Sequence, residues 1–333
     1  MQRQCVWFEK PFHVSVRAEA IPDLAPDQVL VQTIVSAISA GTELLFYRGQ
    51  VPGDLPVDSS IAALNGAMRY PLQYGYACVG RVVACGAQIQ DEWRDRLVFS
   101  FQPHASHFIA RVDELISIPD RIAPEQAAFL PNLETAVNLL MDGAPIIGEQ
   151  VIVIGQGIVG LLTTALLAQM PLARVLTFDA FALRREKSRA LGATDSFDPN
   201  DADAIAQARD ADLTYELSGN PDALNHALAL TGFEGRIVIG SWYGQKRAPI
   251  DFGGAFHRSR IRIISSQVST IASSFAARWN KVRRLDVARA LLARVSFDHL
   301  ITHRFQIEDA ARAYALLDQQ PGHTLQVLLT YDP

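Results

Sequence analysis

Val151-Ile-Val-Ile-Gly-Gln-Gly-Ile-Val-Gly160 is the stretch that decides the fold. Its four consecutive branched aliphatic residues suit a strand that is covered on both faces, as parallel sheets require. The glycines then fit the pattern G-x-G-x-x-G, in which Gly155 makes a tight turn, Gly157 allows close approach to a pyrophosphate, and Gly160 lets a helix pack on the strand. We therefore expect a buried strand, a glycine turn, and a helix whose N-terminus points at a dinucleotide.

An acidic residue at the end of the next strand supports this interpretation, since a lone glycine pattern is common. Arg174-Val-Leu-Thr-Phe-Asp179 predicts a second strand that ends in a carboxylate, 19 residues after Gly160. A carboxylate there accepts from ribose hydroxyls and repels a 2′-phosphate, which favours NAD over NADP. A structural βαβ turn without a ligand is the alternative. The expected cofactor-binding residues are Gly155, Gln156, Gly157, Ile158, Val159, Gly160, Asp179, Arg184, Ser218 and Gly219.

Composition limits the class of protein. The chain has 333 residues, enough for two domains, and 49% are apolar and 20% charged, as in soluble globular proteins. A net charge of -5 gives no basic field for nucleic acid. The three cysteines have no C-x-x-C spacing, which favours a reducing compartment. With no signal-peptide core or membrane-spanning run, we expect a cytoplasmic protein with a small-molecule substrate and neither nucleic acid nor membrane as partner.

Two regions with different residue patterns predict two domains. Residues 1–122 carry short apolar or alternating runs broken by proline and glycine, which favours a β-rich, barrel-like domain. Within this part, residues 48–70 predict a long loop or lobe. Residues 123–270 alternate helix and strand, beginning with an expected helix at 124–143, and predict a doubly wound parallel sheet. Residues 271–333 break the alternation, and we expect their last strand to return to the first domain.

The order of these parts resembles the medium-chain dehydrogenase/reductase superfamily. The resemblance is carried by the glycine turn, by Ser39-Ala-Gly-Thr-Glu43 and by Tyr74-Gly-Tyr-Ala-Cys-Val-Gly80. Within the superfamily the chain is similar to the threonine-dehydrogenase-like branch that includes bacteriochlorophyllide a dehydrogenase, through Trp242-Tyr-Gly244 and Leu300-Ile-Thr-His-Arg304. The resemblance implies an α/β protein with a GroES-like catalytic domain, a Rossmann NAD-binding domain inserted in it, and assembly as a homodimer.

The superfamily's zinc-ligand positions depart from its pattern in this chain. The resemblance places a cysteine, a histidine and a third ligand where the sequence has Ala40, Tyr76 and Pro131. These residues cannot supply a strong set of zinc ligands, and the cysteine quartet of the superfamily's structural zinc is also absent from the sequence. We therefore predict no zinc, either catalytic or structural.

Without a metal, hydrogen-bond donors must stabilise the charge that develops on the substrate oxygen. Tyr76 and Thr42 are the expected donors, since Thr42 stands where the superfamily's proton-relay hydroxyl lies. His104 is the expected proton carrier. Plainer interpretations are an aromatic that only packs, a turn or cap threonine, and a surface-loop histidine. The expected substrate contacts are Glu43, Tyr47, Asn132, Trp242 and Tyr243.

The function that these residues predict is hydride transfer between NAD and a secondary alcohol or ketone. An ene-reductase of the quinone-oxidoreductase type is one alternative, because conjugate reduction requires only that an enolate be stabilised. A dinucleotide-binding protein without turnover is the other, because every zinc ligand is missing.

Overall fold

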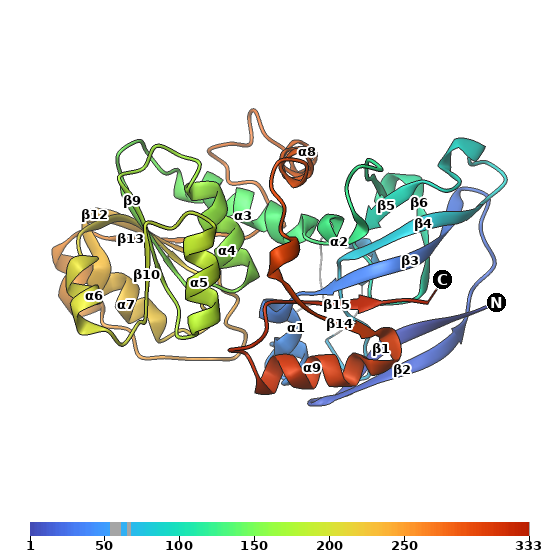
Figure 1. Ribbon diagram of the computed structural model, residues 1–333, viewed down its shortest axis with the longest axis horizontal. Coiled ribbons are helices and arrows are strands. Elements are labelled where there is room, and N and C mark those ends of the chain that lie inside the picture. The colour runs from blue at the N-terminus through green and yellow to red at the C-terminus, as the bar shows by residue number, and fades with distance from the viewer. Residues whose placement is uncertain (54–60, 65–67, 333) are drawn as a thin grey trace. The chain divides into compact units, whose positions relative to one another are not determined.

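A computed structural model of the chain describes residues 1–53, 61–64 and 68–332. Residues 54–60 and 65–67 of the predicted lobe lie outside the described residues. The chain forms two compact units, Met1–Pro131 with Leu291–Pro333, and Asn132–Ala290. The fold is mixed α/β, with a parallel sheet in the second unit and a β-rich architecture in the first, as the sequence predicted (Figure 1).

The second unit is built on a six-stranded parallel sheet with the strand order β10-β9-β8-β11-β12-β13. The order reverses between β8 and β11. The glycine turn that follows β8 therefore lies at the topological switch point, where sheets of this kind bind ligands. The strands are β8 Gln150–Ile154, β9 Arg174–Phe178, β10 Asp195–Phe197, β11 Ala211–Glu216, β12 Thr231–Ile239 and β13 Arg262–Ser265.

Both faces of this sheet are buried, which explains the continuous apolar run in β8. Ile152 and Ile154 pack in one core with residues of α6 and α7. Val151 and Val153, whose side chains point the other way, pack in a second core with residues of α3 and α4 (Figure 1). The helices are α3 Leu130–Gly143, α4 Ile158–Leu167, α5 Ala182–Ala190, α6 Ala202–Gln207, α7 Ala223–Leu230 and α8 Lys281–Leu292.

The single helix predicted at 124–143 was wrong, because the structure has two helices there. The first is α2, Pro124–Ala127, and the second is α3, which begins at Leu130. Pro131 has no N–H to donate to the carbonyl of Ala127, so a continuous helix would lose a hydrogen bond at this position. In the first turn of α3 the missing N–H costs nothing.

The first unit contains a seven-stranded sheet and a separate hairpin of β1 and β2. The sheet order is β14-β15-β3-β4-β5-β7, and β6 pairs with β3. Helix α1, Ala40–Tyr47, follows β3 directly and packs in one core with residues of α9, Ala310–Gln319. The strands are β1 Gln2–Lys10, β2 His13–Ala20, β3 Gln28–Ile38, β4 Cys78–Cys85, β5 Leu97–Ser100, β6 His107–Arg111, β7 Ile116–Ser117, β14 Ile301–Gln306 and β15 Gln326–Thr330.

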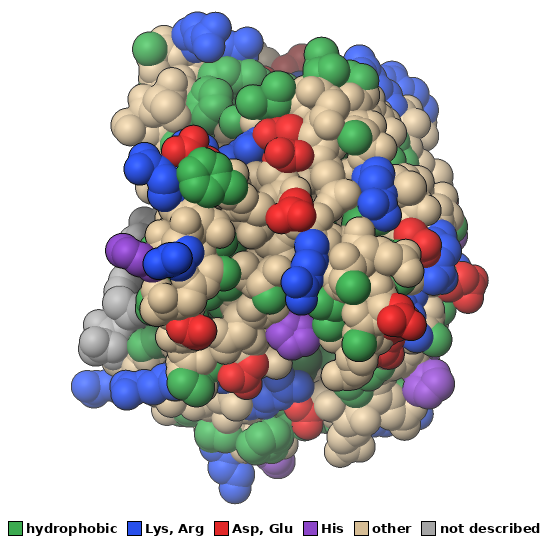
Figure 2. Space-filling model, turned by 90° about the vertical axis from the view of Figure 1, so that its left-hand side faces the viewer, with side chains coloured by type: hydrophobic (Ala, Val, Ile, Leu, Met, Phe, Trp, Pro, Cys, Tyr) green, Lys and Arg blue, Asp and Glu red, His purple; other side chains and the backbone are tan. Residues whose placement is uncertain are grey.

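The surface carries charges of both signs. On the face seen in Figure 2, acidic and basic side chains are interspersed, and hydrophobic side chains lie among them in small groups. Within the described ranges, no helix has both the length and the apolar character needed to cross a membrane.

A buried arginine organises the second unit. Arg284 of α8 has an exposed fraction of 0%, and its five N–H groups all have acceptors. Nε and one Nη2 hydrogen donate to Glu134 Oε1 at 3.0 and 2.9 Å. The others donate to the side chain of Asn138 and to the backbone carbonyls of Val268 and Thr270. This cation therefore joins α3, α8 and the 268–270 segment.

Removal of one partner of this pair should be worse than removal of both. Arg284→Met leaves the Glu134 carboxylate buried without its partner, so the free energy of unfolding should fall by about 3–5 kcal/mol. The double variant Arg284→Met/Glu134→Leu replaces the ion pair by apolar groups and should recover most of this loss. Urea unfolding followed by tryptophan fluorescence measures both. A double variant no more stable than the single one would contradict the ion-pair explanation.

Candidate functional site

The glycine turn has the shape that a dinucleotide requires. Gly155 has a φ of +90°, and a Cβ built on it would lie 2.5 Å from the backbone of Ser218. A Cβ on Gly160 would lie 2.0 Å from the carbonyl oxygen of Gly155. A Cβ on Gly157 would meet no described atom within 4 Å. The outer two glycines are therefore required by the turn and by helix packing, and the middle one presents its backbone to open space.

The first turn of α4 continues this surface. Gly157 is the N-cap residue, and no side chain in the described part of the chain caps the helix there. The N–H groups of Ile158 and Val159 at the helix start suit an anion such as a pyrophosphate. The side chain of Gln156 points inward instead, where its Oε1 accepts from Thr164 Oγ1 at 3.0 Å. The side-chain amide of Gln156 is therefore used inside the protein and does not face a ligand.

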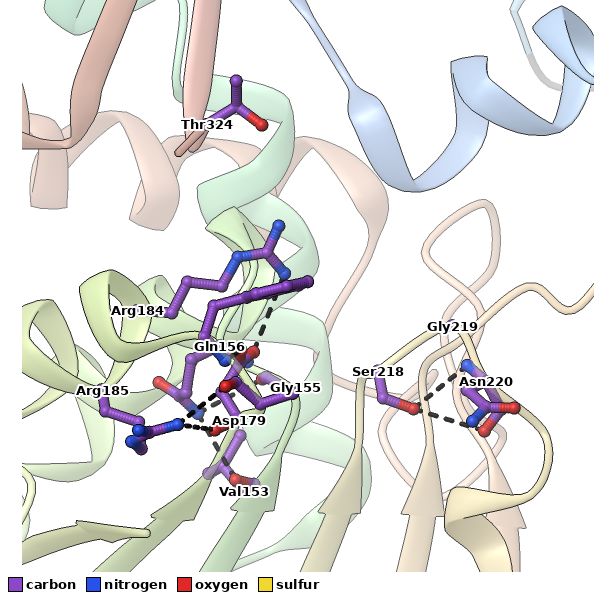
Figure 3. A network of polar contacts seen from close by, with 12 residues as sticks. Val153, Gly155, Gln156, Asp179, Arg184, Arg185, Ser218, Gly219, Asn220 and Thr324 are labelled. Atoms are coloured by element: carbon purple, nitrogen blue, oxygen red, sulfur yellow. Dashed lines mark hydrogen bonds and ion pairs between the residues drawn. The ribbon is translucent and has the colours of Figure 1, made fainter. Parts of the chain in front are cut away.

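Asp179 follows β9 and is fixed to the glycine turn. Its Oδ2 accepts from the Gln156 N–H at 2.7 Å (Figure 3). Its Oδ1 accepts from the Phe181 N–H at 2.9 Å. The Arg184 guanidinium lies 3.7 Å from Oδ2 and stacks over the Phe181 ring. Burial lowers the pKa of Arg184, and the charge of Asp179 opposes that shift. This carboxylate and cation together form a polar edge beside the turn.

The loops after β11 and β12 are held by Glu216, a residue that the sequence analysis missed. Glu216 is fully buried at the end of β11, and its Oε1 accepts from the N–H of Ser218 at 2.8 Å. Its Oε2 accepts from the Tyr243 hydroxyl at 2.5 Å. Gly219 donates its N–H to Ser241 Oγ at 2.9 Å. The predicted residues Ser218, Gly219 and Tyr243 thus lie in one network around a strand-end carboxylate (Figure 3 shows Ser218 and Gly219).

Tyr243 is held in its protonated form in this network. Burial raises the pKa of the Tyr243 phenol, and the nearby Glu216 carboxylate raises it further. Trp242, the neighbouring predicted substrate contact, has an exposed fraction of 36%. The signal that could have identified Glu216 is its place at the end of a strand, directly before a Ser-Gly pair.

In the first unit, three hydroxyl groups gather at the start of α1. Tyr76 OH donates to Ser39 Oγ, the N-cap residue of α1, and lies 3.5 Å from Thr42 Oγ1. Tyr76 and Thr42 are both partly exposed. The structure thus brings the two predicted donors together and adds Ser39. We call Ser39, Thr42 and Tyr76 the hydroxyl cluster.

His104 is not a surface-loop histidine, and that interpretation was wrong. Its exposed fraction is 0%, because the chain packs β3, α1 and Gly75 around the ring. Its Nδ1 lies 2.7 Å from Ser36 Oγ, and its Nε2 lies 3.0 Å from Glu43 Oε2. Glu43, a predicted substrate contact, is likewise fully buried. Neither side chain presents a surface to a substrate in this structure.

Two other predicted substrate contacts lie on helices. Tyr47 is a core residue of α1, where its ring packs against Phe12 and Tyr314. Burial raises the pKa of the Tyr47 phenol, and Asp318 adds to the rise. Asn132 lies in the first turn of α3 with an exposed fraction of 6%.

The residues at the zinc-ligand positions do not fit a zinc ion. Ala40 and Pro131 carry no donor atom, and the Tyr76 hydroxyl already donates to Ser39. Zinc requires three or four nitrogen, sulfur or carboxylate ligands in one place. Across residues 1–53, 61–64 and 68–332, no three His, Cys, Asp or Glu side chains form such a group.

Known proteins match this chain along its whole length. The family model of zinc-binding dehydrogenases matches residues 159–285. The 2-desacetyl-2-hydroxyethyl bacteriochlorophyllide A dehydrogenase of Cereibacter sphaeroides is 26% identical over 349 residues, covering 98% of each chain. A short chain alcohol dehydrogenase from Escherichia coli CFT073, solved with NADH, has a TM-score of 0.78 at 20% identity and covers 99% of each chain. A zinc-binding dehydrogenase from Sinorhizobium meliloti 1021, solved with NADP, has a TM-score of 0.78 at 19% identity and the same coverage.

The fold and the glycine turn are typical of nicotinamide-dependent oxidoreductases, and the family match agrees with that class. Residues 159–285 match the zinc-binding dehydrogenase family, and the chain is similar over almost its whole length to dehydrogenases of the medium-chain dehydrogenase/reductase superfamily. The resemblance noted from its motifs is thereby confirmed.

Two glycine substitutions should separate the turn's shape from its contact with a dinucleotide. Gly155→Ala places a side chain at positive φ against Ser218, so it should lower the free energy of unfolding by about 1–3 kcal/mol. Gly157→Ala meets open space and should leave stability unchanged, yet it should weaken NADH binding roughly tenfold by separating backbone and pyrophosphate. Thermal unfolding and NADH fluorescence titration measure the two effects. Unchanged NADH affinity in Gly157→Ala would refute this placement.

Proposed function

We propose that this protein is an NAD-dependent oxidoreductase that interconverts a secondary alcohol and a ketone without a metal. The observation that carries the proposal is the hydroxyl cluster, since Tyr76 stands at a position where the family resemblance implies a zinc ligand, and Ser39 adjoins another. Hydroxyl donors are the protein's own means of stabilising charge on a substrate oxygen.

The chemistry follows from what a phenol can do. A bound nicotinamide supplies the hydride in reduction and accepts it in oxidation. In reduction, the Tyr76 hydroxyl gives up its hydrogen bond to Ser39 Oγ and donates to the substrate carbonyl oxygen instead. It then transfers its proton to that oxygen as the alcohol forms. Thr42 is partly exposed and lies 3.5 Å from the phenol, so it is within reach to relay a proton from solvent to the Tyr76 phenolate that this step leaves. In oxidation the same groups act in the reverse order.

The proposed cofactor is NAD. Relatives of this fold have been solved with NADH and with NADP, so the fold alone does not choose between them. Asp179 favours NAD, because its carboxylate would lie against a 2′-phosphate. The proposal also includes a small-molecule substrate, a homodimer and a cytoplasmic location, which the family resemblance and the composition support.

The role of Tyr76 can be tested by removing one oxygen atom. Tyr76→Phe should lower kcat roughly 100-fold for ketone reduction, while the dissociation constant for NADH stays unchanged. Tyr70→Phe is the matched control, since it removes a phenol of the same unit that donates to the backbone of Phe46. The assay uses NADH with a panel of ketones and enones, and the products are identified by mass spectrometry.

Unchanged turnover in Tyr76→Phe would remove this residue from the mechanism. A product with a reduced C=C bond and an intact carbonyl would favour the ene-reductase alternative. Tight NADH binding without any turnover over the panel would favour the non-catalytic alternative.

The cofactor preference can be tested at Asp179. Asp179→Ala removes an acceptor for the ribose hydroxyls, so NADH affinity should fall roughly tenfold and the discrimination against NADPH should shrink. Fluorescence titration with both dinucleotides measures this. Equal NADH and NADPH affinities in the unmodified protein would overturn the assignment to NAD.

A further inference from the structure

Glu43 is a buried carboxylate with three donors from separate parts of the first unit. Its Oε1 accepts from the Ser39 N–H at 2.7 Å, and its Oε2 accepts from Tyr314 OH at 2.5 Å and lies 3.0 Å from His104 Nε2. Burying a carboxylate costs several kcal/mol unless its oxygens are hydrogen-bonded. Through these three contacts, Glu43 joins the start of α1, the segment before β6 that carries His104, and helix α9.

His104 is fixed on both ring nitrogens. Its Nδ1 contacts Ser36 Oγ at 2.7 Å, and that hydroxyl lies 2.6 Å from Tyr331 OH. Burial raises the pKa of the Tyr314 and Tyr331 phenols well above the usual value, so both keep their hydrogens. The imidazole is therefore held between a carboxylate on one side and a hydroxyl chain on the other.

Two sets of contacts connect Glu43 and His104 to Tyr76. The first passes through α1, because the Ser39 N–H that bonds Glu43 fixes the residue whose Oγ accepts from Tyr76. The second passes through Gly75, where a Cβ would lie 2.6 Å from His104 Cδ2. Gly75 has a φ of +122° and directly precedes Tyr76, so the ring packs against the backbone that carries the phenol.

From these contacts we infer that Glu43 and His104 are positioning residues for Tyr76. The pair sets both the backbone before the phenol and the hydroxyl that the phenol bonds. The pair thereby preorganises the hydroxyl cluster with protein groups alone. The inference that Glu43 and His104 hold Tyr76 in place rests on the contacts above. Only its consequence for catalysis rests on the proposed function. His104 and Glu43 accordingly act through Tyr76 and do not touch the substrate.

Amide hydrogen exchange tests the placement without any substrate. His104→Phe keeps a ring beside Gly75 but removes the bonds to Glu43 and Ser36, so exchange should speed up roughly tenfold in residues 39–43 and 75–76. His107→Phe is the matched control, because His107 is a nearby, partly buried imidazole that bonds only its neighbour Ser106 among described residues. The control should leave both segments unchanged.

Tyr314→Phe is the second variant, for the case in which His104→Phe does not fold. This change removes one donor to Glu43 and leaves His104 against Gly75. Exchange should then rise in residues 39–43 and stay unchanged in 75–76. Unchanged exchange in residues 39–43, or an equal rise across the whole first unit, would overturn the inference.

A double-mutant cycle tests the catalytic consequence, with NADH and the ketone that the panel in the preceding section reduces fastest. If His104 acts through the phenol, His104→Phe should lower kcat roughly tenfold in the unmodified protein and have almost no further effect in Tyr76→Phe. An equal loss in both backgrounds would show that His104 acts by another route. Because the exchange measurement needs no turnover, a failure of the proposed function is distinguishable from a failure of the placement.

Discussion

A carboxylate buried away from water requires hydrogen-bond donors on its oxygens, and this constraint shapes the first unit of the molecule. Glu43 meets it with Ser39, His104 and Tyr314, which come from the start of α1, the residues before β6 and the middle of α9. If one of these segments moved alone, the buried Glu43 carboxylate would lose a hydrogen-bond partner. The hydroxyl cluster is built on that fixed base.

Buried carboxylates that accept several hydrogen bonds also lie at the ends of strands in the second unit. Asp179 ties the residue after β9 to the backbone of the glycine turn, and Glu216 ties the loop after β11 to Tyr243 in the loop after β12. Each carboxylate orders a loop that would otherwise be free to move, at the edge of the sheet where ligands bind. Rigid loops lower the ordering cost when a dinucleotide binds.

The fold was predictable because its signals are local. The apolar run in β8 and the glycines after it lie within ten residues, and each has a direct physical meaning. The same local reasoning failed at Pro131, where the lost N–H breaks a helix that periodicity alone predicts to be continuous. The surface-loop interpretation of His104 was also wrong, since a His between Pro and Ala carries no local sign of burial.

The site was less predictable because its contacts are long-range. Tyr314 meets Glu43 across 271 positions, and His104 meets it across 61. Neither pairing can be predicted from the spacing of residues in the sequence. Ser39 could have been recognised, since a serine directly before a helix is a common N-cap residue whose hydroxyl lies at the helix start. Tyr76 and Thr42 were predicted as site residues only because a family resemblance marked their positions.

The central claim is that protein hydroxyls, and not a metal, act on the substrate oxygen. The most direct test is elemental analysis of active protein, purified without added metal and dialysed against a chelator, with NADH-dependent turnover measured on the same sample. The account predicts far less than one zinc per chain with full turnover. One zinc per chain, together with turnover that chelation abolishes and zinc restores, would contradict it.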